Sequence, residues 1–142
     1  MYRHILIPTD GSELAEHAVT HGLSLAKSVG AKVTVVIVEE PFASDPFRSE
    51  TSALEQLAEH KEQVESVLRR AADAAKKAGV PCDTMQVAPT ETYQAIIATA
   101  SDRGCDLIVM ASHGRGGLSA VLLGSVTNKV LTHTKTPVLV YR

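Results

Sequence analysis

The chain has 142 residues, of which 44% are hydrophobic, and its formal net charge is −2. A chain of this length can bury a substantial core without disulfides or metals, so we expect one domain across residues 1–142. The scattered lysines and arginines argue against a protein that binds nucleic acid.

The first third of the chain predicts a strand, a helix and a second strand. Residues 4–8 are a short apolar segment that ends at a proline, and residues 33–38 are rich in β-branched side chains. Between them, Ser12 is placed to cap a helix that Gly30 ends. The expected apolar stripe of this helix consists of Ala15, Ala18, Val19, Gly22, Leu25, Ala26 and Val29.

The middle of the chain predicts an irregular connection and a long helix. Residues 39–51 contain two prolines and two phenylalanines, which favour an irregular connection. A capping box at Ser52 and Glu55 predicts the start of a helix that Gly79 ends. The expected apolar stripe of this helix consists of Leu54, Leu57, Ala58, Val64, Leu68, Ala71 and Ala75.

The rest of the chain continues the alternation. The expected elements are a strand at residues 82–88, a helix from a cap at Thr90 to about Arg103, a strand at residues 107–110, a helix from a cap at Ser125 to about His133, and a strand at Val138–Tyr141. Five strands separated by helices predict an α/β fold with a doubly wound, five-stranded parallel sheet and helices on both faces. The expected strand order is 3-2-1-4-5.

A glycine-rich loop precedes the last helix and contains Gly114, Gly116, Gly117 and Gly124. A strand, such a loop and a helix start gather backbone N–H groups at the positive end of the helix dipole, which suits a phosphate. In the expected order the sheet reverses between its first and fourth strands, and open sheets of this kind bind ligands at that point. Loop chemistry and topology therefore predict the same cleft, although the loop could also be a connection that binds nothing.

The chain resembles the universal stress protein family over essentially its whole length. The resemblance rests on residues 4–12, the strand end at 36–38, residues 106–128 and residues 136–140. The ATP-binding branch of that family carries G-x2-G-x9-G-[ST] after the fourth strand. This chain has Ala111-x2-Gly114-x9-Gly124-Ser125, so the spacing is kept while alanine replaces the first glycine.

The resemblance implies a site for ATP, alone or with Mg²⁺. Gly114, Arg115, Gly124, Ser125 and Val126 fall in the loop that holds the phosphates and ribose, and Thr9, Asp10 and Val38 fall at the adenosine end. The full expected set is Pro8, Thr9, Asp10, Val38, Met110, Ala111, Gly114, Arg115, Gly124, Ser125, Val126 and Thr127.

Several of these residues also have purely structural interpretations. Asp10 could be a carboxylate that stabilises a helix start, and Ser125 could cap the last helix. Gly114 and Gly124 could allow close backbone approach or could only supply positive φ for turns. Val38 could be an ordinary core residue of its strand.

Other catalytic or metal-binding patterns are incomplete. His17 and His21 lie one helical turn apart but opposite the apolar stripe and without a third ligand, so we expect an exposed face. Ser112 and His113 lack a nucleophile elbow, and we expect their side chains to diverge. The loop also lacks a Walker A lysine, so we name no catalytic residue and expect at most slow ATP hydrolysis.

Two functions remain for the chain. The first is a regulatory, stress-response protein that binds an adenine nucleotide. The second is an interaction protein of the same fold whose cleft is empty. We also expect a homodimer through Val138–Tyr141, because an apolar edge strand with unpaired backbone groups is a liability unless it is covered, charged or paired.

We expect the protein to act in the cytoplasm. Cys82 and Cys105 lie far apart and outside any C-x-x-C pair, which favours a reducing compartment over a disulfide framework or a zinc site. No apolar stretch has the length of a membrane span, and the opening residues read as a strand rather than a signal peptide.

Overall fold

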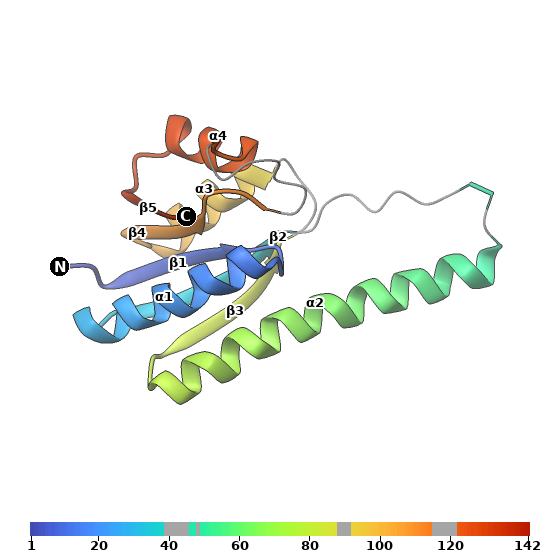
Figure 1. The fold of residues 1–142 in the computed structure, drawn as a ribbon, viewed down its shortest axis with the longest axis horizontal. Coiled ribbons are helices and arrows are strands. Elements are labelled where there is room, and N and C mark those ends of the chain that lie inside the picture. The colour runs from blue at the N-terminus through green and yellow to red at the C-terminus, as the bar shows by residue number, and fades with distance from the viewer. Residues whose placement is uncertain (39–45, 48, 88–91, 115–121) are drawn as a thin grey trace.

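The computed structural model describes residues 1–38, 46–47, 49–87, 92–114 and 122–142 (Figure 1). Its elements in chain order are β1 (His4–Thr9), α1 (Glu13–Val29), β2 (Lys32–Val38), α2 (Glu50–Ala78), β3 (Cys82–Val87), α3 (Thr92–Arg103), β4 (Leu107–Ala111), α4 (Ser125–His133) and β5 (Val138–Tyr141). The expected helix cap at Thr90 and most of the connection at residues 39–51 lie outside the described residues.

The five strands form one parallel sheet in the order β3-β2-β1-β4-β5, which confirms the predicted topology. Helices α1 and α2 cover one face, and α3 and α4 cover the other (Figure 1). From β1 the strands are added toward one edge of the sheet as β2 and β3, and then toward the other edge as β4 and β5, so the strand order reverses between β1 and β4. A crevice therefore opens where the carboxyl ends of these two strands meet.

Strand β1 lies at the centre of the sheet, and all six of its residues are buried. Ile5 and Ile7 pack into the core under α1 and α2, whereas Leu6 packs into the core under α3 and α4. Because both faces are covered, the strand is continuously apolar instead of alternating. Its central position places Thr9 and Asp10 in the middle of the crevice.

Helix α1 has the predicted ends. The side chain of Ser12 accepts a hydrogen bond from the backbone N–H of Ala15, and Gly30 ends the helix at φ 74°. The buried stripe differs from the prediction at three positions, because Leu23 is buried while Leu25 and Val29 are only partly buried.

Helix α2 begins earlier than the sequence predicted. Ser49, not Ser52, is its cap, and the side chain of Ser49 accepts a hydrogen bond from the backbone N–H of Ser52 at 3.2 Å. The helix cap therefore lies about one turn before the predicted cap at Ser52. Ser49 and Ser52 are both suitable capping residues, so the residue type alone does not choose between them.

The first half of α2 extends beyond the sheet (Figure 1). A helix of 29 residues is about 43 Å long, whereas a strand of seven residues such as β2 is about 23 Å long. Leu54 and Leu57 lie on this extension and are 63% and 52% exposed, so the prediction that they join the core was wrong. The buried residues of α2 are Val64, Val67, Ala71 and Ala75.

The amino ends of the strands form a separate polar network. Nε2 of His4 lies 2.7 Å from Oγ1 of Thr34, and the Asp106 carboxylate accepts hydrogen bonds from the backbone N–H groups of Arg3 and His4. Burial, with the nearby positive charge of Lys32, lowers the pKa of His4. Burial raises the pKa of Asp106, but the backbone hydrogen bonds outweigh it and hold this pKa below its ordinary value of 3.8. This network joins β1 to β2 and β4 at the edge opposite the crevice.

Candidate functional site

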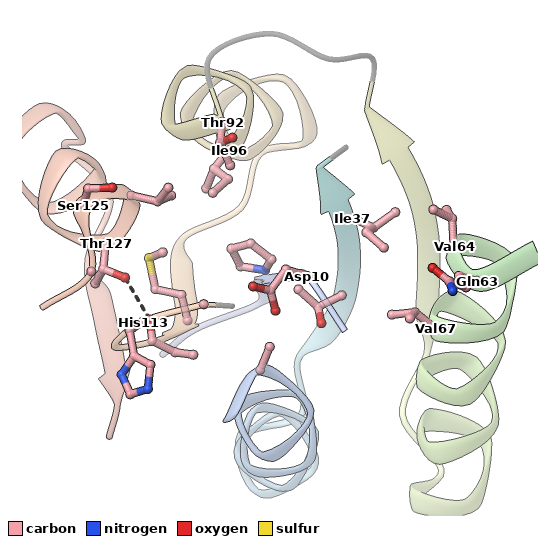
Figure 2. Close-up of a pocket in the computed structure, with 18 of the residues that line it drawn as sticks. Asp10, Ile37, Gln63, Val64, Val67, Thr92, Ile96, His113, Ser125 and Thr127 are labelled. Carbon is pink, nitrogen blue, oxygen red and sulfur yellow. Dashed lines mark hydrogen bonds between the residues drawn. The ribbon is translucent and has the colours of Figure 1, made fainter. Parts of the chain in front are cut away.

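A cavity of about 480 Å³ occupies the crevice at the carboxyl ends of β1, β2 and β4 (Figure 2). Ten of the twelve predicted site residues line it, namely Pro8, Thr9, Asp10, Met110, Ala111, Gly114, Gly124, Ser125, Val126 and Thr127. Val38 is the last residue of β2, and its neighbour Ile37 lines the cavity. Arg115 lies outside the described residues.

Asp10 joins the end of β1 to the start of α1. Its Oδ1 accepts a hydrogen bond from the backbone N–H of Ser12 at 2.9 Å, which shapes the turn before the helix. Its Oδ2 faces Gly114, and a Cβ added to Gly114 would collide with that oxygen. Asp10 therefore combines the structural role at the helix start with a place on the cavity wall.

Gly124 lies in close contact with the chain that leaves β4. Its backbone N–H donates a hydrogen bond to the carbonyl oxygen of Ser112 at 2.7 Å. A Cβ at Gly124 would lie 3.0 Å from Cα of His113 and 3.2 Å from the same carbonyl oxygen. A side chain there would require the backbone of Ser112 and His113 to shift by a few tenths of an ångström.

The two motif glycines lie in close contacts rather than at positive φ. Gly124 has φ −61° and ψ 155°, which any residue can adopt. Among the described residues, the glycines with positive φ are Gly11, Gly30, Gly79 and Gly104. Of the two sequence interpretations of Gly114 and Gly124, the structure thus favours close backbone approach.

Helix α4 begins at Ser125 with Gly124 as its cap, so the prediction that Ser125 caps this helix was wrong. Glycine offers no side chain to the first N–H groups of the helix, and those groups carry the partial positive charge of the helix dipole. The first turn is held to β4 by Thr127, which is 2% exposed and donates from Oγ1 to the carbonyl oxygen of Ala111 at 2.9 Å (Figure 2). Ser125 and Val126 line the cavity in the same turn.

Ala111, which replaces the first motif glycine, fits its place without backbone strain. No described non-glycine residue has positive φ, and Ala111 is the last residue of β4. It forms a small buried cluster with Ala15 and Ala18 of α1. Its methyl group therefore contributes to packing under α1, although the residue also borders the cavity.

A second wall of the cavity comes from residues that the sequence analysis did not select. Helix α2 contributes His60, Gln63, Val64 and Val67, and Ile37, Thr92, Ile96, Ala15 and His113 complete the lining. The length of α2 relative to the strands was the sequence feature that could have revealed this wall. A helix longer than its strands extends past one end of the sheet, here the end where the cavity lies.

Ser112 and His113 do not diverge as expected. Oγ of Ser112 lies 3.2 Å from Nδ1 of His113, although Ser112 is only 5% exposed. His17 and His21 are exposed, as predicted, and their rings contact Tyr141 at centroid distances of 6.4 Å and 4.5 Å. In the described part of the chain, no three metal-ligating side chains gather into a group.

None of the described helices combines the length and apolar character needed to cross a membrane. Cys82 and Cys105 are free cysteines, and burial raises the pKa of both thiols, that of Cys105 to about 11. The two thiols are thus held in their protonated form and are poor nucleophiles.

Comparison with known proteins places the chain in a family. Residues 1–142 match the model of the universal stress protein family. Universal stress protein MJ0531 of Methanocaldococcus jannaschii is 32% identical over 144 residues, which cover the whole of this chain and 83% of that protein.

Solved structures share the same fold. The structure of hypothetical protein MJ0577, also from M. jannaschii, aligns with a TM-score of 0.81 at 30% identity, covering 99% of this chain and 96% of that one. A universal stress protein in complex with cAMP aligns with a TM-score of 0.74 at 26% identity, covering 99% and 97%. Together with the motif spacing and the strand order, these matches show that the chain belongs to the universal stress protein family.

Proposed function

We propose that this protein binds ATP or a related adenine nucleotide in the cavity between β1 and β4 and acts as a regulatory, stress-response protein. The observation that carries the proposal is the convergence of Gly114, Gly124 and the start of α4 on one cavity at the reversal of the sheet. Close backbone approach and a helix dipole are the features with which proteins bind phosphate. The similar protein in complex with cAMP supports an adenine nucleotide as the ligand.

The proposed orientation follows the distribution of groups in the cavity. The phosphates lie against Gly114, Gly124 and the first turn of α4, where Ser125 can donate its hydroxyl. The adenosine end lies toward Thr9, Asp10 and Val38. A cavity of about 480 Å³ lies within the range of small-molecule sites. Mg²⁺ would accompany the phosphates, and Asp10, at the adenosine end of the cavity wall, is the carboxylate that could accept a hydrogen bond from a ribose hydroxyl.

Hydrolysis in this proposal is slow. Fast phosphoryl transfer needs a positioned base and groups that stabilise the developing charge. Asp10 is the acidic residue among the described lining residues. We expect turnover well below about 1 per second, the low end of typical enzymes. Rapid turnover that Asp10→Asn abolishes would reveal an active site.

The alternative function is an interaction protein that binds no nucleotide, and the alanine at position 111 was its main support. The Ala111 methyl packs with Ala15 and Ala18, and a cavity of about 480 Å³ is present with this alanine in its lining, which supports the nucleotide-binding function. Calorimetric titration with ATP, ADP and AMP, each with and without Mg²⁺, tests the choice. Heat of binding with a rise in unfolding temperature supports nucleotide binding, whereas neither effect at millimolar ATP supports the alternative.

We further propose that the protein is a cytoplasmic homodimer paired through β5. This strand is at the edge of the sheet, and Leu139 on it is 42% exposed. Antiparallel pairing of two β5 strands across a two-fold axis would satisfy their free backbone groups and close without forming a fibre. Two free cysteines are compatible with the cytoplasm.

A further inference from the structure

The α2 wall of the cavity has an apolar centre, Val64 and Val67, with the polar side chains of His60 and Gln63 beside it. Ile37, Val64 and Val67 form a buried cluster with exposed fractions of 5%, 4% and 9%. Gln63 precedes Val64 and lies one helical turn before Val67, on the side of α2 that faces the cavity (Figure 2). An apolar surface with a single amide at its border suits an aromatic ring that has a polar edge.

The amide of Gln63 is available to a ligand. The residue is exposed and lines the cavity, and no other residue in the described ranges hydrogen-bonds to its side chain. A glutamine amide offers an acceptor oxygen and a donor NH₂ group side by side. It can therefore make two hydrogen bonds to a partner that presents one donor next to one acceptor.

Gln63 and the start of α4 lie on opposite sides of the cavity. In Figure 2, Ser125 lies on one side, Gln63 on the other, and Asp10 between them. A nucleotide with its phosphates at α4 and its ribose near Asp10 extends its base toward α2. This placement rests on the proposed function.

We infer that Gln63 is a specificity-determining residue that reads the polar edge of the adenine base. Adenine presents its N6 amino donor beside a ring-nitrogen acceptor, which is the pattern that a glutamine amide complements. Ile37 and Val64 supply the apolar surface for the face of the ring. The α2 wall thus adds base recognition to a cavity whose opposite wall binds phosphate.

The test replaces the amide by a carboxylate in Gln63→Glu and compares ATP with GTP. A carboxylate only accepts hydrogen bonds. On the edge that carries N1, it therefore repels the N1 acceptor of adenine but suits the adjacent N1–H and N2–H donors of guanine. The added negative charge affects both triphosphates alike, so the ratio of the Kd for GTP to the Kd for ATP reports only the effect of the base on affinity. We expect the Kd for GTP divided by the Kd for ATP to fall by at least about tenfold relative to wild type.

The matched control is Gln56→Glu, the same change on the same helix two turns earlier and outside the cavity lining that the structure describes. It should leave the ratio at the wild-type value, and thermal unfolding without ligand checks that both variants fold. If wild type binds ATP but Gln63→Glu keeps its ratio, or Gln56→Glu shifts it equally, the assignment of Gln63 is overturned. If wild type binds neither nucleotide, the proposed function fails, and this inference fails with it.

Discussion

The hydroxyl of Thr127 donates a hydrogen bond to the carbonyl oxygen of Ala111 at 2.9 Å, and this contact joins the first turn of α4 to the end of β4. Sixteen positions separate the two residues in the chain, and both are buried. The contact holds the positive end of the α4 dipole over the crevice. The geometry of the candidate phosphate site therefore depends on the Thr127 side chain, which is hydrogen-bonded to the end of strand β4.

Thr127→Val should destabilise the protein and weaken ATP binding. Valine keeps the shape but leaves the buried carbonyl of Ala111 without this donor, which costs about 1–3 kcal/mol. Thr132→Val is the matched control, because Thr132 is exposed and donates to the carbonyl oxygen of Asn128 within the same helix. Urea unfolding measures both variants, and equal losses of stability would contradict the role of the Thr127 contact.

Gly114→Ala should destabilise the ligand-free protein because its methyl group meets the carboxylate of Asp10. The physical cause can be isolated with a double-mutant cycle, in which Asp10→Ala removes the obstructing group. In the Asp10→Ala background, Gly114→Ala should cost less free energy of unfolding than in wild type. An equal cost in both backgrounds would show that position 114 needs glycine for another reason.

Leu139→Asp should separate the proposed homodimer into monomers, since it places a charge on the edge strand that two copies would share. Leu131→Asp is the control, because Leu131 has a similar exposure of 38% but lies on α4. Analytical ultracentrifugation at tens of micromolar should give a dimer for wild type and Leu131→Asp and a monomer for Leu139→Asp. A wild-type monomer, or a dimer that survives Leu139→Asp, contradicts the proposed interface.

Asp106 should contribute to stability at neutral pH and lose that contribution in acid. Its pKa in the folded protein lies below the ordinary value of 3.8, so the folded state favours the charged form. The stabilisation is present above the unfolded pKa and disappears as the pH falls through the folded pKa. Asp106→Asn should thus be less stable than wild type at pH 7, with the difference shrinking toward pH 3. A difference that does not change with pH would contradict this assignment.

The parts of the fold that depend on local chemistry could be predicted from the sequence. The cap at Ser12, the left-handed Gly30 and the buried apolar run of β1 each depend on nearby residues, and the strand order followed from the alternation of strands and helices. The start of α2 could not be predicted, because Ser49 and Ser52 both satisfy the capping pattern.

The candidate site was predictable where a motif marks it and was missed where only packing creates it. The spacing of Gly114 and Gly124 selected the α4 wall, whereas Gln63 and Val64 lie within an ordinary amphipathic helix. Nothing in the local sequence separates Val64 from Leu54, which belongs to the same predicted apolar stripe but is exposed. The position of Gln63 and Val64 at the cavity follows from the length of α2 relative to the sheet.

The binding of ATP to wild type and to Gly124→Val, measured by calorimetry side by side, tests the central claim most directly. A side chain at Gly124 would press against the backbone of Ser112 and His113 and displace the start of α4 from the phosphates. We predict that wild type binds ATP and that Gly124→Val, shown to be folded by its thermal unfolding without ligand, binds at least about tenfold more weakly, a loss of about 1.4 kcal/mol. Unchanged affinity in the folded variant, or no binding by wild type at millimolar ATP, would contradict the claim.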